Sequence, residues 1–436
     1  MIGLQGGSVK YPPNFSVTRI FVLFSWLGQD IPLSEMGGSM SSGPLKGILV
    51  LDCGLLVQGP QAAAALCDMG AKVIKVELPG MGDPTRTLSL GADDSRSAWF
   101  NGINRGKKSI TIDLRTSDGA TIFKQLAMKA DVVISNFKPG TMESWGLGYE
   151  DLSKINPALI WGAGSAFGPV GPDASREGAD LAAQAAGGLV STIGHKGQPP
   201  SPVGVTIADH IASQNMVSGV LAALFSRHET GEGQKLEVSL LGGQIWAQAA
   251  EYTYFLMTNK VPGRGGFGHP LLRGIYGLFE TKDDWIGVIG VPSNVRDSFF
   301  SVIGAPELAL DQRFLGYVAT REDLDELFDR LNEVFRTKNT DEWIKIFESI
   351  GVRWAPVRDY RGVVDDPGPW ENGYFQEVCD SDGEEFRSVG VPIRLSRTPL
   401  SVSGSAPALG EHTDDLLLEL GYSSEEISSL REDGSI

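Results

Sequence analysis

"KGILVLDCGLLVQGPQAAAALCDMGAKVIKVE", residues 46–77, reads as a complete strand–helix–strand unit. A short apolar run is followed by an alanine-rich stretch, with Pro60 in its first turn and Gly70 at its end. These are the positions that proline and glycine favour in helices. A second apolar run follows directly. Strand, helix and strand at this spacing predict two parallel strands joined by a crossover helix.

The same alternation continues towards the C-terminus. It predicts an α/β fold whose large domain is a Rossmann-like, doubly wound sheet, and ligands of such sheets bind at the carboxyl ends of the strands. The G-x-G-x-x-G fingerprint is missing after the first strand, which counts against a nicotinamide dehydrogenase. Further strands are predicted at residues 108–114, 131–137, 159–166 and 234–241, and helices at 117–130, 151–158 and from about Asp209 to residue 230.

A different pattern follows residue 237. Residues 274–290 resemble a β-hairpin, and residues 321–335 carry apolar side chains at helical spacing. Asn339 and Glu342 have the spacing of a capping box, which predicts another helix. We therefore expect a second, smaller α+β domain.

The C-terminal part begins with residues 365–373, "DDPGPWENG", which are typical of a linker. Two short helices are predicted near the end, the second with a capping box formed by Ser423 and Glu426. The predicted organisation has four parts: an N-terminal extension at 1–43, the first part of the large domain at 44–237, the small domain at 238–365, and a segment at 366–436 that returns to the large domain.

Composition limits the partners and the compartment. The 436 residues carry a formal net charge of −17, which repels nucleic acid and anionic membranes, so neither is expected as a partner. The 3 cysteines have neither paired nor metal-ligand spacing, which favours a reducing, cytoplasmic setting and no metal. The apolar run within residues 1–43 is too short to span a bilayer. We interpret this extension as a misassigned start, with the functional chain beginning near Met36 or Met40.

Two acids stand at the beginning of helices that otherwise read as buried core. Asp209 opens the helix that starts near it, and Asp180 opens an Ala/Gly-rich helix. Each has a purely structural explanation, because aspartate caps helix N-termini. An ionised carboxylate is also a usable nucleophile, so both explanations can hold. His210 is adjacent to Asp209 and cannot face it on a helix, which makes it a packing or surface residue.

A glycine-rich stretch at residues 263–270, "GRGGFGHP", is by default a flexible loop. It is also a candidate lid over a ligand, formed by Gly265, Gly266 and Gly268.

Several longer motifs resemble the class III CoA-transferases. They include the opening unit with its continuation "LPGMGDPTR", then "FNGINRGKKSITIDLRTSDG", "ADVVISNFKPGTMESWGLGYEDLSKINPALI", "VGVTIADHIAS" and "LGEHTDDLLLELGYSSEEI". The resemblance runs in order from Leu45 to the C-terminus. The same family contains α-methylacyl-CoA racemases, so the resemblance alone does not decide the reaction.

The resemblance implies specific roles. Asp209 matches the nucleophile that forms an aspartyl-CoA thioester, and Asp180 matches a second, supporting carboxylate. It also implies an interlaced homodimer that binds no cofactor permanently and uses a coenzyme A thioester and a carboxylic acid as substrates. The implied CoA-binding positions are Val57, Gln58, Ile112, Asp113, Leu114, Arg115, Asn136, Phe137 and Lys138.

Two alternatives stay open. A racemase must remove a proton on one face of its substrate and return one on the other, which needs two acid/base groups. Racemases of the family place a histidine before the second carboxylate, where this chain has Ala179. The other alternative is an inactive CoA-binding scaffold, against which the intact Asp209 argues.

Overall fold

The computed structural model describes residues 43–88, 97–272, 274–311, 321–379, 385–402 and 404–436. The predicted extension and the proposed start near Met36 or Met40 lie outside the described residues, apart from Gly43. Among the helices within these ranges, none is long and apolar enough to cross a membrane.

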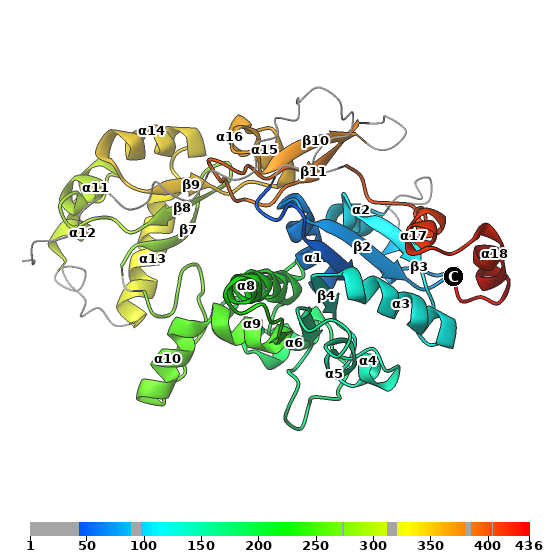
Figure 1. The fold of residues 1–436 in the computed structure, drawn as a ribbon. Helices are drawn as coiled ribbons and strands as arrows, with labels where there is room; N and C mark the ends of the chain where they lie inside the picture. The colour runs from blue at the N-terminus through cyan, green and yellow to red at the C-terminus, as the bar shows by residue number, and fades with distance from the viewer. Residues whose placement is uncertain (1–42, 89–96, 273, 312–320, 380–384, 403) are drawn as a thin grey trace, which may run out of the picture. The chain divides into compact units, whose positions relative to one another are not determined.

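Residues 49–239 contain a six-stranded sheet, in which each strand runs parallel to its neighbours (Figure 1). The order is β3-β2-β1-β4-β5-β6, so the chain starts in the middle, moves to one edge and then builds the other. The predicted parallel α/β sheet is thereby confirmed. Its strands are β1 (Leu49–Asp52), β2 (Lys72–Glu77), β3 (Lys108–Thr111), β4 (Val132–Ser135), β5 (Ile160–Ser165) and β6 (Lys235–Ser239).

Helices connect these strands. They are α1 (Gln58–Asp68), the 3-10 helix η1 (Pro84–Thr87), α2 (Ala98–Asn104), α3 (Ser117–Lys129), α4 (Thr141–Ser144), α5 (Tyr149–Leu152), α6 (Asp180–Ala186), α7 (Leu189–Thr192) and α8 (Ile207–Thr230), and after β6 come α9 (Leu240–Ala247) and α10 (Ala249–Thr258).

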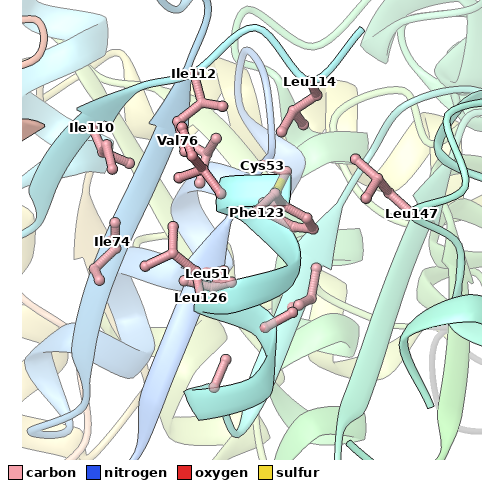
Figure 2. Packing of buried hydrophobic residues seen from close by; sticks show 14 of the residues in the cluster. Leu51, Cys53, Ile74, Val76, Ile110, Ile112, Leu114, Phe123, Leu126 and Leu147 are labelled. Carbon is pink, nitrogen blue, oxygen red and sulfur yellow. The ribbon is translucent and has the colours of Figure 1, made fainter. Parts of the chain in front are cut away.

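Successive residues of a strand point to opposite faces of the sheet, and both faces are covered. Leu51 of β1 and Ile74 of β2 belong to a core that includes Phe123 of α3 (Figure 2). Their neighbours Val50 and Val73 belong to a second core, with α1 and α8. The continuous apolar character of the strands follows from this double burial.

The alanine run of α1 has a packing reason. α1 contacts β1, β2, β4, α2 and α8, and the alanines at positions 62–65 are all buried. A helix enclosed on most of its sides requires small side chains to approach its neighbours closely.

A second sheet, antiparallel, is formed by β7 (Tyr276–Glu280), β8 (Trp285–Ile289) and β9 (Trp354–Pro356). The predicted hairpin and the predicted capping box of Asn339 and Glu342 are confirmed. Its core is aromatic, with Phe335 in contact with Phe279, Trp343 and Phe347. The helices of this region are α11 (Arg296–Val302), α12 (Glu307–Leu310), α13 (Arg321–Phe335) and α14 (Thr340–Ile350).

The segment predicted to be a linker contains a helix, so that prediction is wrong in part. The Asp366 carboxylate accepts the N–H of Gly368, and Pro367 occupies the first helical position, as a helix start requires. The elements here are α15 (Tyr360–Val364), α16 (Pro367–Glu371) and the antiparallel pair β10 (Phe375–Cys379) and β11 (Glu385–Val389).

The last two helices, α17 (Thr413–Leu420) and α18 (Ser424–Glu432), were predicted, and so was the capping box of Ser423 and Glu426. The segment before them is bonded to β3, because the His412 N–H donates to the Ser109 carbonyl at 2.9 Å. The boundaries of the large and small domains stay predictions.

Candidate functional site

Buried charges support the loop that follows β1. Lys75 and Asp52 are both fully buried, and Lys107 is nearly so. Lys107 Nζ donates to Asp52 Oδ2 at 2.7 Å, and Lys75 Nζ donates to the Gly54 carbonyl at 2.9 Å. Asp52 Oδ1 accepts the Gly54 N–H at 2.9 Å. Both bonds to Gly54 fix the first residues of this loop.

The charges in this cluster perturb one another. Burial, only partly offset by Asp52, lowers the pKa of Lys107 to about 8. The pKa of Asp52 stays below its usual value even though burial would raise it, because Lys107 and Lys75 flank it. The cluster is therefore a network of ion pairs with no access to solvent, and such a pair is strongly destabilising to break.

Asn136, which follows β4, holds the same loop from the other side. Its Oδ1 accepts the Leu55 N–H at 2.7 Å and its Nδ2 donates to the Leu55 carbonyl at 2.8 Å. The next residue, Leu56, has a φ of 61°, a left-handed backbone that costs a non-glycine residue roughly 1–2 kcal/mol. The surrounding bonds therefore impose a loop conformation that leucine does not favour.

Val57 and Gln58 stand where this loop enters α1. Val57 is the N-cap and makes no side-chain cap, and Gln58 is the first helical residue. Gln58 is 2 % exposed, and its Nε2 has no hydrogen-bond partner among the described residues. A Cβ on Gly164 of β5 would lie 2.4 Å from Gln58 Oε1, so Gly164 makes room for the amide. A buried, unused N–H donor is thus present where the first loop, α1 and β5 meet.

The start of α8 packs against the start of α1. Ser213 Oγ donates at 2.8 Å both to the Gln58 carbonyl and to the Asp209 carbonyl. His210 lies on the same turn, and its Nδ1 is 2.5 Å from Gln61 Oε1 of α1. His210 therefore has the packing role predicted for it, and the region of Gln58 and the region of Asp209 lie next to each other.

The two acids predicted from the sequence come together here. Asp180 Oδ1 accepts the Ala208 N–H at 2.7 Å and, at 3.4 Å, the Asp209 N–H. Asp180 does not cap its own helix, whose N-cap is Ala179, but caps α8 from across the fold. Asp209 is the third residue of α8, and its side chain makes no capping hydrogen bond among the described residues. Helix capping therefore explains Asp180, although the helix that it caps is α8 and not its own. Capping does not explain Asp209.

Asp209 is chemically the more unusual of the two acids. Its carboxylate accepts no hydrogen bond from any side chain or backbone N–H within the described part of the chain. Burial, and secondly the charge of Asp180, raise the pKa of Asp209 to about 7. A half-buried carboxyl with no partner and a pKa near neutrality is typical of a reactive group.

The residues predicted after β3 lie differently. The side chains of Ile112 and Leu114 are buried in the core of α3, which leaves only their backbone for a ligand (Figure 2). Asp113 pairs with Arg115 at 2.7 Å, and the exposed Arg115 holds the pKa of Asp113 below its usual value. No contact among the described residues joins this pair to Asp209.

Phe137 and Lys138 continue from Asn136. The Phe137 ring meets Trp145 edge-on at 5.5 Å between ring centres, and Lys138 Nζ pairs with Glu177 at 2.5 Å. Both line a small cavity at the ends of β4 and β5.

The glycine-rich loop is bonded to the last residue of α7 and to the segment that follows it. The Gly265 N–H donates to the Thr192 carbonyl at 2.8 Å, and the Gly266 N–H donates to the Gly194 carbonyl at 3.1 Å. A Cβ on Gly268 would lie 2.2 Å from the Tyr276 carbonyl oxygen, so only glycine fits there. The loop, including Arg264, lines a cavity of about 660 Å³ together with His195 and Tyr276. Its role as a lid stays a prediction.

The sequence did not reveal three contributors: Lys75, Lys107 and Gln184. Lys75 lies inside an apolar strand, and this position is a signal of burial in the sequence. Among the described residues, no group of three His, Cys, Asp or Glu side chains could hold a metal ion.

Comparison with known proteins places the chain among similar sequences and structures. The family model described as CoA-transferase family III matches residues 45–413. The chain is 33% identical to the succinyl-CoA–D-citramalate CoA-transferase of Chloroflexus aurantiacus over 89% of this chain and 97% of that protein. It is 31% identical to the human succinyl-CoA:glutarate CoA-transferase over 94% of this chain and 93% of that protein. The crystal structure of a CAIB/BAIF family protein from Brucella suis matches with a TM-score of 0.76 at 32% identity, over 87% of this chain and 100% of that one.

Proposed function

The chain belongs to CoA-transferase family III, and we propose from this that it moves coenzyme A from an acyl-CoA donor to a carboxylic acid through Asp209. One observation carries the proposal. Asp209 is half-buried, it has no hydrogen-bond partner among the described residues, and its pKa is raised to about 7. A carboxylate with these properties is poorly stabilised by its surroundings and therefore nucleophilic.

The reaction proceeds in four steps. The ionised Asp209 attacks the donor thioester carbonyl, and the C–S bond breaks to give a mixed anhydride and the CoA thiolate. The thiolate then attacks the aspartyl carbonyl, which leaves an aspartyl-CoA thioester and releases the donor acid. The acceptor carboxylate and the thiolate repeat the two steps in reverse order, which restores Asp209. The free energy of the thioester is conserved because no intermediate is hydrolysed, so neither ATP nor a permanently bound cofactor is needed.

The first loop contributes to binding and to charge stabilisation. Gln58 Nε2 is a buried donor without a partner among the described residues, and the Gln58 carbonyl accepts the hydroxyl of Ser213, one turn after Asp209 on α8. We assign it to an oxygen of the acyl group, whose negative charge grows as Asp209 attacks. Val57 and the backbone of Ile112 and Leu114 contact coenzyme A. Asp113, Arg115, Asn136, Phe137 and Lys138 complete the CoA site.

The relatives suggest a class of substrates. Their names specify succinyl-CoA as donor and D-citramalate or glutarate as acceptor. We therefore propose succinyl-CoA and dicarboxylic acids as the first pair to test. The loop with Gly265, Gly266 and Gly268 is the proposed lid that keeps water from the anhydride.

The assembly proposed is an interlaced homodimer built on a doubly wound, Rossmann-like large domain. Apolar side chains are strongly exposed along α8 to α10, which supports a partner on this surface. They are Phe225 (73 % exposed), Trp246 (73 %), Leu256 (80 %) and Met257 (81 %).

Two other functions are less well supported. Racemisation needs a second acid/base group where Ala179 stands, and alanine offers none. A CoA-binding scaffold without activity would not require an unpaired, half-buried Asp209, which has no structural role among the described contacts. Deuterium uptake at C2 of a 2-methylacyl-CoA in heavy water would favour the racemase.

The test is direct. The protein is incubated with succinyl-CoA and a panel of carboxylic acids, and the acyl-CoA products are identified by mass spectrometry. New acyl-CoA species that depend on the enzyme and on the acid are expected. Tight CoA binding without transfer to any acid would favour the scaffold.

A further inference from the structure

Gln184 occupies a position between the acidic pair and the start of α8. It lies one turn after Asp180 on α6, and its side chain is 1 % exposed. Its Nε2 donates to Asp180 Oδ2 at 2.5 Å and to the Val205 carbonyl at 3.3 Å. Its Oε1 accepts the Val203 N–H at 3.1 Å. One amide therefore holds both the Asp180 carboxylate and the segment that leads into α8.

Because of these bonds, the two acids differ in how well their surroundings stabilise a negative charge. Asp180 accepts hydrogen bonds from Gln184 and from the N–H groups of Ala208 and Asp209, all of which stabilise a negative charge on it. The carboxylate of Asp209 accepts none among the described residues. When two neighbouring carboxyls compete for one proton, the one without donors takes it.

We infer that Gln184 is a positioning residue for the transfer reaction: it holds Asp180 against the N-terminus of α8 and so decides that Asp209 is the acid that gains and loses the proton. The inference rests on the proposed function, since it assigns Gln184 a part in preparing the nucleophile. Gln184 acts through Asp180 and is not itself catalytic.

Few other charges act on this pair. The charge of Asp180 also acts on His210, whose pKa is nevertheless lowered, because burial outweighs it. α1 presents the neutral Gln58 and Gln61 here, and its only charged residue, Asp68, is paired with Arg105 at its far end. The sequence of α9 contains no charged residue. The charged residues of β6 are Lys235 and Glu237, which form an ion pair with each other. Asp180 is thus the charged side chain through which Gln184 acts on Asp209.

The experiment is a titration of Asp209 in Gln184→Met. Carboxyl ¹³C shifts of aspartate-labelled protein are followed against pH, and the Asp209 signal is assigned as the one absent from Asp209→Asn. We expect the midpoint of the Asp209 titration to fall by about half a pH unit or more. The reason is that Asp180 loses a hydrogen-bond donor and is no longer held against the N-terminus of α8. Transfer should lose kcat with little change in KM for the acyl-CoA.

A matched control is Gln248→Met. Gln248 is also a buried glutamine, and its Nε2 donates to two carbonyls, of Gly187 at the other end of α6 and of Gln244. It should lower Tm similarly and leave the Asp209 midpoint in place. Gln184→Asn, which retains the amide but withdraws it from Asp180, is the second variant should Gln184→Met not fold, and the same shift is expected.

An unmoved Asp209 midpoint in the Gln184 variants, or an equal shift in Gln248→Met, would overturn the inference. The proposed function fails separately, if Asp209→Asn retains normal transfer. The titration does not depend on that result, so the two failures are distinguishable.

Discussion

Asp180 caps the helix that carries Asp209, although Asp180 lies 28 positions before Ala208, whose N–H it accepts at 2.7 Å. The arrangement places one negative charge at the positive end of α8 and a second carboxyl on the same turn. The cap stabilises the helix, while its charge disfavours ionisation of Asp209. One side chain thus has opposite effects on helix stability and on the charge of Asp209.

The first prediction concerns Asp209→Asn. Asparagine retains the size and polarity of the side chain but cannot form the anhydride, so we expect a folded protein that binds CoA with transfer reduced by several orders of magnitude. Steady-state transfer assays measure the loss, and hydroxylamine trapping of wild type with donor alone should modify Asp209. Normal transfer without deamidation, or an adduct at Asp180, would contradict the mechanism.

The second prediction concerns Asp180→Asn. Asparagine can still accept the Ala208 N–H, so only the charge at the helix N-terminus is lost, which should cost about 1 kcal/mol or less of unfolding free energy. The pKa of Asp209 should fall but stay above 3.8, because burial, the larger cause of its shift, remains. The acid limb of the pH–kcat profile therefore moves to lower pH, and turnover decreases. Asp359→Asn is the control, because Asp359 caps α15 through the Gly362 N–H, outside the site. Unchanged turnover and an unmoved limb would leave Asp180 as a cap alone.

The third prediction concerns stability against pH. The folded-state pKa of Asp209 is raised from 3.8 to about 7, so the protonated form favours folding, and this contribution is lost as pH rises from about 4 to 7. Asp209→Asn should therefore become more stable relative to wild type across this range, with the difference levelling off above pH 7. Urea unfolding of both proteins at pH 5 and pH 8 measures it. A difference that is independent of pH would refute the raised pKa.

The fourth prediction concerns the buried ion pair. Lys107→Met leaves Asp52 with Lys75 alone, whose Nζ is 3.8 Å away, and should cost about 3–5 kcal/mol of unfolding free energy. Combining it with Asp52→Asn should cost clearly less than the sum of the two single changes, because the unpaired charge is removed. Denaturant titrations of the four proteins test the coupling. Strict additivity would show that the pair does not interact.

The fifth prediction concerns Asn136→Ala, which frees Leu55. We expect KM for the acyl-CoA to rise several-fold, because the first loop is no longer fixed. Asn156→Ala is the matched control, since Asn156 also donates to two carbonyls, those of Ala127 and Ala130, away from the site. Both variants should lose similar stability, but only Asn136→Ala should change KM. Equal KM values for the Asn136→Ala and Asn156→Ala variants would show that the fixed loop does not contribute to CoA binding.

The fold was largely predictable because its signals are local. Apolar runs, the proline and glycine at the ends of α1, and the capping boxes at Asn339 and Ser423 each depend on residues close in sequence. Two local predictions fail. The helix predicted at 151–158 is absent beyond Leu152, where α5 ends. In α16, the same aspartate and proline that suggest a linker also begin a short helix. Composition does not distinguish the two, because both use the same residues.

The site was predictable only in part, because its decisive contacts are not local. Their positions at the beginning of buried helices indicated Asp180 and Asp209 as unusual acids, but not that Asp180 caps the helix of Asp209. Lysines are rarely buried, so nothing in the sequence identified Asp52 as the partner of Lys107, 55 positions away. Such pairs are determined by the order of strands in the sheet, which brings β1, β2 and β3 together.

The central position of β1 has a consequence for how the protein opens. β1 pairs with β2 and β4 and is covered on both faces, so its amide protons should exchange with solvent only when the whole sheet unfolds. The Cys53 N–H extends this ladder by donating to the Ile134 carbonyl at 2.8 Å. The loop that begins there is therefore attached to the part of the chain that opens last, and local fluctuations at the sheet edges cannot release it.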